Sequence, residues 1–321
     1  MNKKIIKYAK IILPLLLGVF FIAYSYYNTS EEDRHKIYTS IKNADYFWVF
    51  LSLVMGGLSH LSRAYRWNFL LAPMGYRPRY PNNLMAVAIA YLANLGVPRS
   101  GEVLRATTLA SYENVPFQKA FGTIVAERVV DLFMLFLIVL LAFIFQTETI
   151  LGFFIERGFN LNILLLFIGI GLFCLFIFIR FIKRSKASFA IKIKKFIKGL
   201  LEGATSIFKM KRRGLFAFHT FFIWTMYVLM FWVIRYSMPE TQNLPFSAII
   251  TAFIAGTFAI STTNGGVGLY PIAVGKILVI YGISQTAADA FGWIMWTSQT
   301  LLVVFIGALS FLFLPIYNRS K

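Results

Sequence analysis

The sequence predicts an all-α polytopic membrane protein, and three observations lead to this fold class. Hydrophobic residues make up 58% of the 321 residues and charged residues only 14%, so a water-soluble domain of this composition would expose large apolar patches. Several apolar stretches have the roughly 20 residues that are needed to cross a bilayer core. The net charge of +19 gathers in short segments between these stretches, which is typical of cytoplasmic loops and argues against a nucleic-acid-binding surface.

About six apolar stretches are long enough to form full transmembrane helices. The first of them follows four lysines, as in a signal peptide, but it is longer than a typical signal core and no small-x-small cleavage pattern follows it. We therefore expect it to remain as the first span. The six expected spans cover residues 11–27, 47–71, 121–145, 160–182, 214–236 and 289–316.

Two further apolar stretches, 83–112 and 247–283, are interrupted in the middle by glycine-rich sequence. The distribution of Lys and Arg places both chain termini and the basic segment 183–213 in the cytoplasm. This assignment is consistent only if each interrupted stretch enters and leaves the membrane on the same side. We therefore expect two re-entrant broken helices, with kinks in complete spans as the alternative.

The expected elements group into two units of inverted topology, each made of a span, a broken helix and a span. Broken helices in inverted repeats are typical of transporters, because backbone at a break is tolerated where it lines a cavity. Between the units, the lysine-rich segment is either an amphipathic helix on the inner leaflet or a solvated linker. The expected organisation is an N-terminal helix and external loop over 1–46, a first unit over 47–145, a connecting helix and basic cytoplasmic segment over 146–213, and an inverted second unit over 214–321.

The first interruption reads GVPRSGEVLR, from Gly96 to Arg105. Its glycines permit tight backbone geometry, and its proline disfavours helix at the preceding residue. Ser100 could cap a new half-helix that begins at Gly101, which would direct backbone N–H groups toward the break. Arg99 adds a positive charge there, and Arg105 follows. This combination suits a phosphate or carboxylate.

Acidic residues near these arginines predict an internal charge network. Charges at mid-bilayer cost about 2.5–3.5 kcal/mol each, so they require partners. Helical spacing places two acids of the AERVVD motif together, with an arginine nearby. In the alternative interpretation, Arg99 is held by Glu102 and the site is structural. The expected network joins Glu102, Glu127 and Asp131 to Arg99, Arg105 and Arg128.

The second interruption reads NGGVG, from Asn264 to Gly268, and it lacks the GKS and the flanking strand of a nucleotide loop. As the break of a re-entrant helix, it offers hydrogen bonds and close backbone approach. Lys276 lies about two turns further on and could meet a headgroup or pair with Asp289. Upstream, Arg63 is either an interfacial anchor or a ligand for a lipid phosphate. The expected substrate-binding residues are Arg63, Arg99, Arg105, Asn264, Gly265, Gly266, Gly268 and Lys276.

Catalytic and metal chemistry have little support in the sequence. The three histidines, His35, His60 and His219, lie in different segments, and Cys174 is the single cysteine. No HExxH, CxxC or GxSxG motif occurs. We expect no metal, no cofactor and no catalytic residue. The expected partners are membrane lipids with an anionic headgroup. A second copy of the chain or a partner synthase is also a possible partner, whereas nucleic acid is not expected.

The order of four motifs resembles a known family. RAYRW, GVPRSGEVLR, AERVVD and NGGVG occur in this order, and the likeness extends from about Ala44 to Leu314. The chain looks like the transmembrane flippase-like domain of lysylphosphatidylglycerol synthases and its free-standing relatives. The likeness implies a multi-pass protein of the bacterial inner membrane that moves an anionic phospholipid or a polyprenyl-linked lipid between leaflets. The aminoacyl transferase domain of the bifunctional members is not expected here.

One motif departs from the family pattern. Relatives often carry proline before the glycines, whereas Asn264 stands there in this chain, and Leu269-Tyr270-Pro271 follow them. The leading functional hypothesis is a lipid flippase. A membrane-embedded transferase acting on a lipid or lipid-linked sugar is the first alternative. A non-transporting membrane protein that presents its basic segment to a partner is the second.

Overall fold

The computed structural model describes residue 20, residues 23–24 and 26–27, residues 29–145, residue 180 and residues 210–319. Helices are the only regular secondary structure in these ranges, which confirms the predicted all-α class. Most of the expected span 11–27, nearly all of the span 160–182 and most of the basic segment 183–213 lie outside the described residues.

The chain divides into two units, which we describe separately. The first comprises residues 1–124 and 210–321, and the second comprises residues 125–209. Helix α6 (Phe117–Phe145) begins in the first unit and continues into the second. The two expected inverted units, 47–145 and 214–321, therefore fall into one compact unit of the structure, except for most of α6.

Helix α2 (Glu31–Lys42) occupies the stretch that we expected to be an external loop. Ser30 caps it by accepting a hydrogen bond from the Asp33 N–H at 3.0 Å, and its first turn is acidic, which suits the positive end of a helix dipole. Lys36 and Glu32, four residues apart, form an ion pair of 2.7 Å. These local signals stabilise helix in a segment that is too polar for a span.

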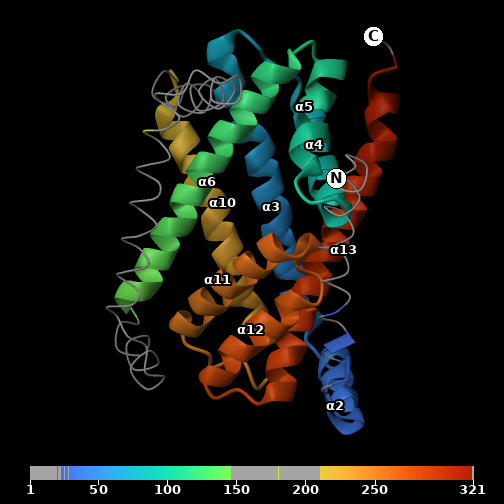
Figure 1. Ribbon diagram of the computed structural model, residues 1–321, viewed down its shortest axis with the longest axis vertical. Helices are drawn as coiled ribbons and strands as arrows, with labels where there is room; N and C mark the ends of the chain where they lie inside the picture. Colours follow the sequence, from blue (N-terminus) through green and yellow to red (C-terminus); the bar gives the residue numbers. More distant parts are fainter. Residues whose placement is uncertain are drawn as a thin grey trace. The chain divides into compact units, whose positions relative to one another are not determined.

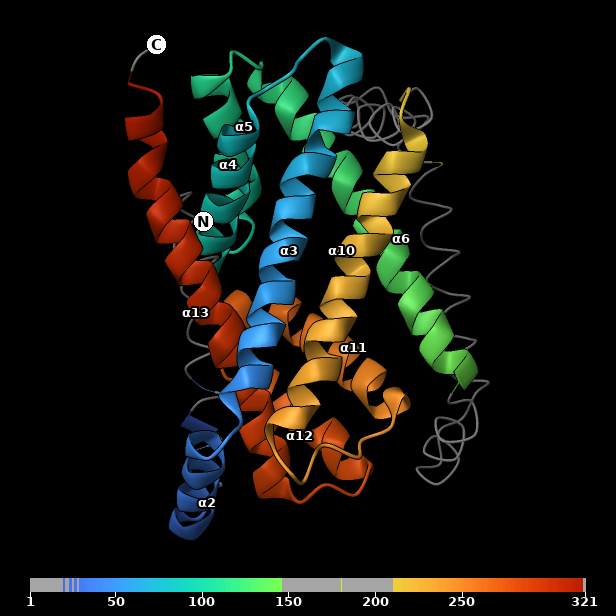
Figure 2. The same ribbon diagram turned by 180° about the vertical axis from the view of Figure 1, so that it is seen from behind.

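Helices α3 (Tyr46–Leu71) and α10 (Arg213–Ile234) pack side by side in opposite directions, as Figure 1 and Figure 2 show. At one end, the Asp45 N–H donates to the Ser237 carbonyl at 2.8 Å. Toward the other end, Nη1 of Arg66 donates to Oγ1 of Thr220 at 2.9 Å. The start of α3 therefore meets the end of α10, and the end of α3 meets the start of α10.

Helices α4 (Tyr80–Gly96) and α5 (Ser100–Tyr112) form the first hairpin, joined by residues 97–99. Near their open ends, Nε of Arg79 pairs with Oε1 of Glu113 at 2.9 Å, and Asn82 donates to the same oxygen. Asn318 exchanges hydrogen bonds with Asn82 at 2.9 and 3.0 Å. The hairpin therefore starts and ends in one place, beside the end of α13 (Gln285–Tyr317).

Helices α11 (Phe246–Thr262) and α12 (Leu269–Ile280) form the second hairpin, with the short 3-10 helix η3 (Asn264–Gly266) at its tip. Near its open end, the hydroxyls of Thr251 and Tyr281 lie 3.4 Å apart. Gly256 lets Tyr270 pack tightly between the two helices, because a Cβ atom there would lie 2.7 Å from the tyrosine ring.

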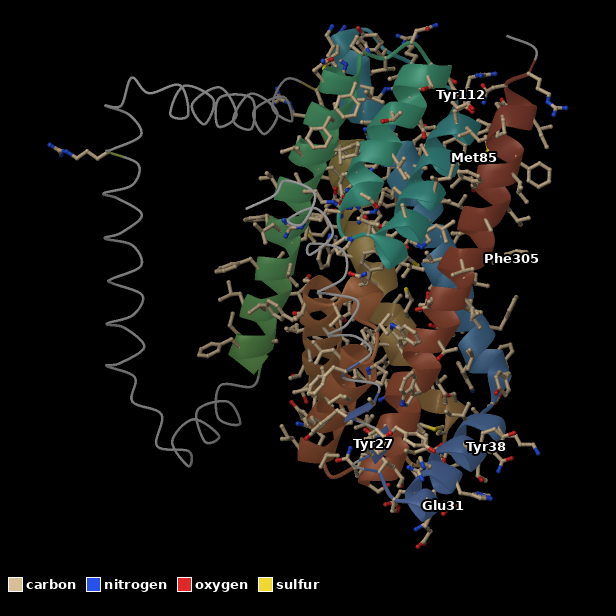
Figure 3. All side chains as sticks on the ribbon, turned by 45° about the vertical axis from the view of Figure 1, so that its right-hand side comes forward. Tyr27, Glu31, Tyr38, Met85, Tyr112 and Phe305 are labelled. Carbon is tan, nitrogen blue, oxygen red and sulfur yellow. The ribbon has the colours of Figure 1, made fainter. Side chains whose placement is uncertain are left out.

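Helix α13 runs beside both hairpins. A Cβ atom at Gly292 would lie 2.8 Å from Cα of Pro271 in α12, and one at Gly307 would lie 3.0 Å from the Ala88 carbonyl in α4. Such close approach between helices is typical of membrane interfaces built on small residues. Away from these contacts, α13 carries exposed apolar side chains such as Phe305, which projects outward in Figure 3.

The expected spans 47–71, 121–145, 214–236 and 289–316 coincide with α3, α6, α10 and α13. By length and apolarity, the segments Arg213–Ser237 and Gln285–Tyr317 qualify as membrane spans among the described residues. A third candidate is the pair Glu31–Lys42 and Tyr46–Met74, which is bent by 74° and includes the 3-10 helix η1 (Ala72–Met74). The remaining 3-10 helix is η2 (Arg235–Ser237). The number of complete crossings and the inverted layout therefore stay predictions.

Candidate functional site

The tips of the two hairpins touch each other. Nδ2 of Asn264, in the second tip, donates to the Gly96 carbonyl in the first at 3.1 Å. A Cβ atom at Gly265 would overlap Cδ2 of Leu95, so the backbone of one tip lies directly against a side chain of the other. Nε1 of Trp296 in α13 donates to the Gly265 carbonyl at 2.8 Å. We call these contacts the tip junction.

The first tip closes through side chains. Arg99 adopts a left-handed backbone conformation with φ of 61°, which is unfavourable for a residue with a Cβ atom. Ser100 Oγ donates to the Val97 carbonyl at 2.7 Å and to the Ala93 carbonyl at 3.1 Å. Ser100 is thus not the cap that we expected: α5 begins at Ser100, and Arg99 holds the capping position without a side-chain bond.

One backbone donor at the start of α5 is also occupied. The Gly101 N–H donates to Oδ1 of Asn94 at 2.8 Å. We predicted that Gly101 permits a tight turn, but the structure gives it another role. A Cβ atom there would lie 2.7 Å from the Ala90 carbonyl carbon. Gly101 allows α5 to approach α4. Fewer free N–H groups therefore point toward an anion than the sequence suggested.

The charged residues at and after the first tip differ in exposure. Arg99 is exposed at the tip, Glu102 is part-exposed and Arg105 is 3% exposed. The Arg105 guanidinium carbon lies 3.8 Å from the ring centroid of Trp67, a cation–π contact in which the flat ion covers the indole face. The indole in turn donates to Thr123 at 2.8 Å. Arg105 is therefore held at depth, while Arg99 is available at the surface.

The second tip closes through glycine backbone. Gly265, Gly266 and Gly268 all have positive φ, at 61°, 80° and 71°, where residues with a Cβ atom are disfavoured. Asn264 is 1% exposed, and its Oδ1 has no hydrogen-bond partner among the described residues. The predicted break at NGGVG is thus present. Asn264 joins the two tips.

Lys276 lies away from this junction. Its side chain is exposed on α12, and among the described residues no ion pair joins it to Asp289. Oδ1 of Asp289 instead accepts a hydrogen bond from Gln285 at 2.8 Å and rests against Gly275. In the structure Asp289 is therefore partnered by Gln285 and not by Lys276.

Arg63 is a buried residue and not an interfacial anchor. It is 2% exposed, and its Nη2 donates to the Tyr227 hydroxyl at 3.3 Å. That hydroxyl lies 3.3 Å from the hydroxyl of Tyr91, whose ring packs 4.6 Å from the ring of His60. These aromatic partners were not predicted from the sequence, because tyrosines in apolar helices are usually core residues and no local pattern distinguishes them.

Three residues of the expected charge network belong to the second unit. Within it, Nη1 of Arg128 lies 3.6 Å from Oδ2 of Asp131, as the helical spacing predicts. Glu127 and Asp131 are buried. Their pairing with the arginines of the first unit stays a prediction.

Comparison with known proteins points to one family. The family model described as the lysylphosphatidylglycerol synthase TM region matches residues 11–310. The chain is similar to UPF0104 membrane protein MJ1595 of Methanocaldococcus jannaschii, with 29% identity over 168 residues, which are 50% of this chain and 48% of that protein. It is also similar to Glycosyltransferase AglD of Haloferax volcanii, with 28% identity over 130 residues. That match covers 40% of this chain and 20% of that protein, so less than half of either relative is spanned. No solved structure matches.

Proposed function

Because the chain belongs to the family of the lysylphosphatidylglycerol synthase TM region, we propose that this membrane protein moves a lipid between the leaflets of the bilayer. The observation that carries the proposal is the tip junction, in which two broken helical segments meet. Broken helices whose ends meet inside a membrane are how many transporters build a polar site.

The proposal makes both hairpins re-entrant. Helices α4 and α5 have 17 and 13 residues, and α11 and α12 have 17 and 12. At about 1.5 Å per residue, none of them reaches much beyond 25 Å, which is less than a hydrocarbon core of about 30 Å. Each hairpin therefore dips in and returns. If the two hairpins enter the membrane from opposite faces, as the two inverted repeats would require, their tips meet inside the bilayer.

The proposed cargo carries an anionic headgroup. Arg99 is exposed beside the tip junction, and arginine matches a phosphate with two parallel hydrogen bonds. In this proposal Arg105 and Arg63 attract the same group from greater depth. The acidic residues Glu102, Glu127 and Asp131 keep the arginines in position. In this proposal the protein lies in a bacterial inner membrane with both termini cytoplasmic. Rocking of the two inverted repeats exposes the headgroup to either leaflet.

Transport of fluorescent phospholipids in proteoliposomes tests the proposal. We expect Arg99→Ala and Glu127→Ala each to slow transbilayer movement of an anionic lipid at least tenfold. Arg77→Ala is the matched control, because Arg77 is an exposed arginine of the loop before α4. Normal movement in both site variants would contradict the mechanism. Equal slowing in the control would show a general effect of positive charge.

A transferase is the second candidate, and the similarity to Glycosyltransferase AglD favours it. In this case a buried carboxylate such as Glu127 would act on a lipid-linked sugar as an acid or base. Purified protein incubated with lipid-linked sugar donors decides between the two functions. A new glycolipid product that is lost in Glu127→Gln would support the transferase, and lipid movement without product supports transport.

A further inference from the structure

Four aromatic side chains from three helices form a continuous row beside Arg63. The rings of His60 and Tyr91 lie 4.6 Å apart, and the hydroxyls of Tyr91 and Tyr227 lie 3.3 Å apart. The ring of Tyr227 meets that of Trp224 at 5.9 Å and 75°. The row thus crosses from α3 through α4 to α10. We call it the aromatic row.

Both ends of the aromatic row carry a buried nitrogen without a hydrogen-bond partner. Nδ1 of His60 and Nε1 of Trp224 have none among the described residues, and each side chain is 7% exposed. A buried polar atom without a hydrogen-bond partner is destabilising, so a ligand that supplies the partner gains affinity. Tyr91 and Tyr227, in the middle of the row, are part-exposed. The row therefore combines two unmet hydrogen-bonding groups with an accessible centre.

The chemistry of these groups selects the kind of ligand. An indole N–H only donates, so Trp224 requires an oxygen that accepts. The imidazole of His60 donates or accepts at Nδ1 according to its tautomer. A hydroxyl group satisfies every combination, whereas an ammonium group cannot accept from the indole. Aromatic rings also offer apolar faces to the C–H groups of a polyol.

We propose that the aromatic row is a subsite for the hydroxyl groups of a lipid headgroup, a glycerol or a sugar, and that it determines specificity. The proposal rests on the proposed function in one respect, namely that this protein binds a lipid headgroup. Arg63 shares the Tyr227 hydroxyl with the row, so an anionic group next to the hydroxyls would be attracted at the same place. The two features together fit a headgroup with both a phosphate and hydroxyls.

Lipid binding by the purified protein, measured by native mass spectrometry, tests the subsite. The probes are phosphatidylglycerol, phosphatidylinositol, phosphatidic acid and phosphatidylethanolamine with identical acyl chains. We expect the wild type to bind the two hydroxyl-bearing lipids about tenfold more tightly than phosphatidic acid, and phosphatidylethanolamine most weakly. One lost hydrogen bond is worth about 1.0–1.4 kcal/mol, which corresponds to five- to tenfold in affinity.

Three variants separate recognition from folding. Trp224→Phe and His60→Leu should reduce the preference for hydroxyl-bearing lipids about fivefold while affinity for phosphatidic acid stays unchanged. His60→Asn should keep the preference, because the amide also donates and accepts. Trp293→Phe, in α13, is the matched tryptophan control and should have no effect.

Two outcomes would contradict the proposed subsite. A wild type that binds phosphatidic acid as tightly as phosphatidylglycerol overturns the subsite, and so do variants that weaken all lipids equally. Phosphatidylinositol binding more tightly than phosphatidylglycerol assigns a sugar-like ring, and the reverse assigns a glycerol. Selective binding without any transbilayer movement would refute the transport proposal and leave the subsite standing.

Discussion

The two hairpins have the same plan but close their tips by different means. The first uses side chains: Ser100 and Asn94 bind backbone groups, and Arg99 takes the left-handed position. The second uses three glycines with positive φ, and a tryptophan from α13 holds its backbone. Charge is concentrated in the first tip, whereas the second is uncharged from residue 261 to residue 275.

This difference indicates a division of work. Glycine backbone can approach a neighbour closely, and the second tip presses its Gly265 against Leu95 of the first. The first tip carries a strained, exposed arginine at the same junction. Strain at a residue that could have been glycine costs about 1–2 kcal/mol, and it is retained where the side chain is needed. Under the proposed function, the first tip would supply the charge that binds the headgroup, and the second tip would supply the close contact between the hairpins.

The largest expected effect is the loss of the first hairpin in Gly101→Val. The first atom of the new side chain would already meet the Ala90 backbone, which cannot move without separating α4 from α5. We expect the free energy of unfolding in detergent to fall by about 3 kcal/mol or more. Denaturant-induced unfolding followed by circular dichroism measures this change.

Gly96→Ala is the matched control in the same hairpin. A Cβ atom at Gly96 meets nothing within 4 Å, and its φ is not positive. We expect no loss of stability, since alanine is the better helix former. Equal losses in both variants would mean that α4 and α5 do not approach each other at Gly101.

A smaller loss is expected for Gly265→Ala, which tests the fit of the second tip. The left-handed conformation costs about 1–2 kcal/mol for alanine, and the methyl group also overlaps Leu95. We expect a loss of about 2 kcal/mol in the same unfolding measurement. Gly282→Ala, at φ of 86° with no atom within 4 Å, should pay only the conformational cost.

The added cost at Gly265 should depend on the opposite tip. Replacing Leu95 by alanine in the Gly265→Ala background should recover part of the lost stability, although Leu95→Ala alone removes packing. Additive losses in the double variant would show that the tips do not touch in the membrane-inserted protein.

Much of the helical plan is readable in the sequence, because apolar length and interrupting glycines act locally. The interruptions predicted both hairpins to within a few residues: the first spans 80–112 and the second 246–280, against the expected 83–112 and 247–283. Helix α2 was missed because its polar residues were interpreted only as lying outside the membrane. Its cap and its ion pair were visible in the residues.

The tip geometry was harder to predict, since it depends on contacts between distant segments. Asn264 donating to Gly96 joins residues 168 positions apart, and nothing in either motif indicates the other. Ser100 has the residue type of a helix cap, yet the tight turn directs its hydroxyl back to Ala93 and Val97. Residue types therefore identified where the two helical breaks lie, whereas the hydrogen-bond partners at the tips depend on tertiary packing.

The smallest expected effect separates stability from function at Arg99. Arg99→Gly removes the strain of the left-handed position, so we expect the protein to become more stable by about 1 kcal/mol while lipid movement falls. Asn114→Gly is the matched control, because Asn114 has φ of 54° outside the tip, and it should leave movement unchanged. Unfolding and transport are measured on the same preparations. Normal movement in Arg99→Gly would remove Arg99 from the headgroup site, and a loss of stability would mean that its side chain holds the tip together.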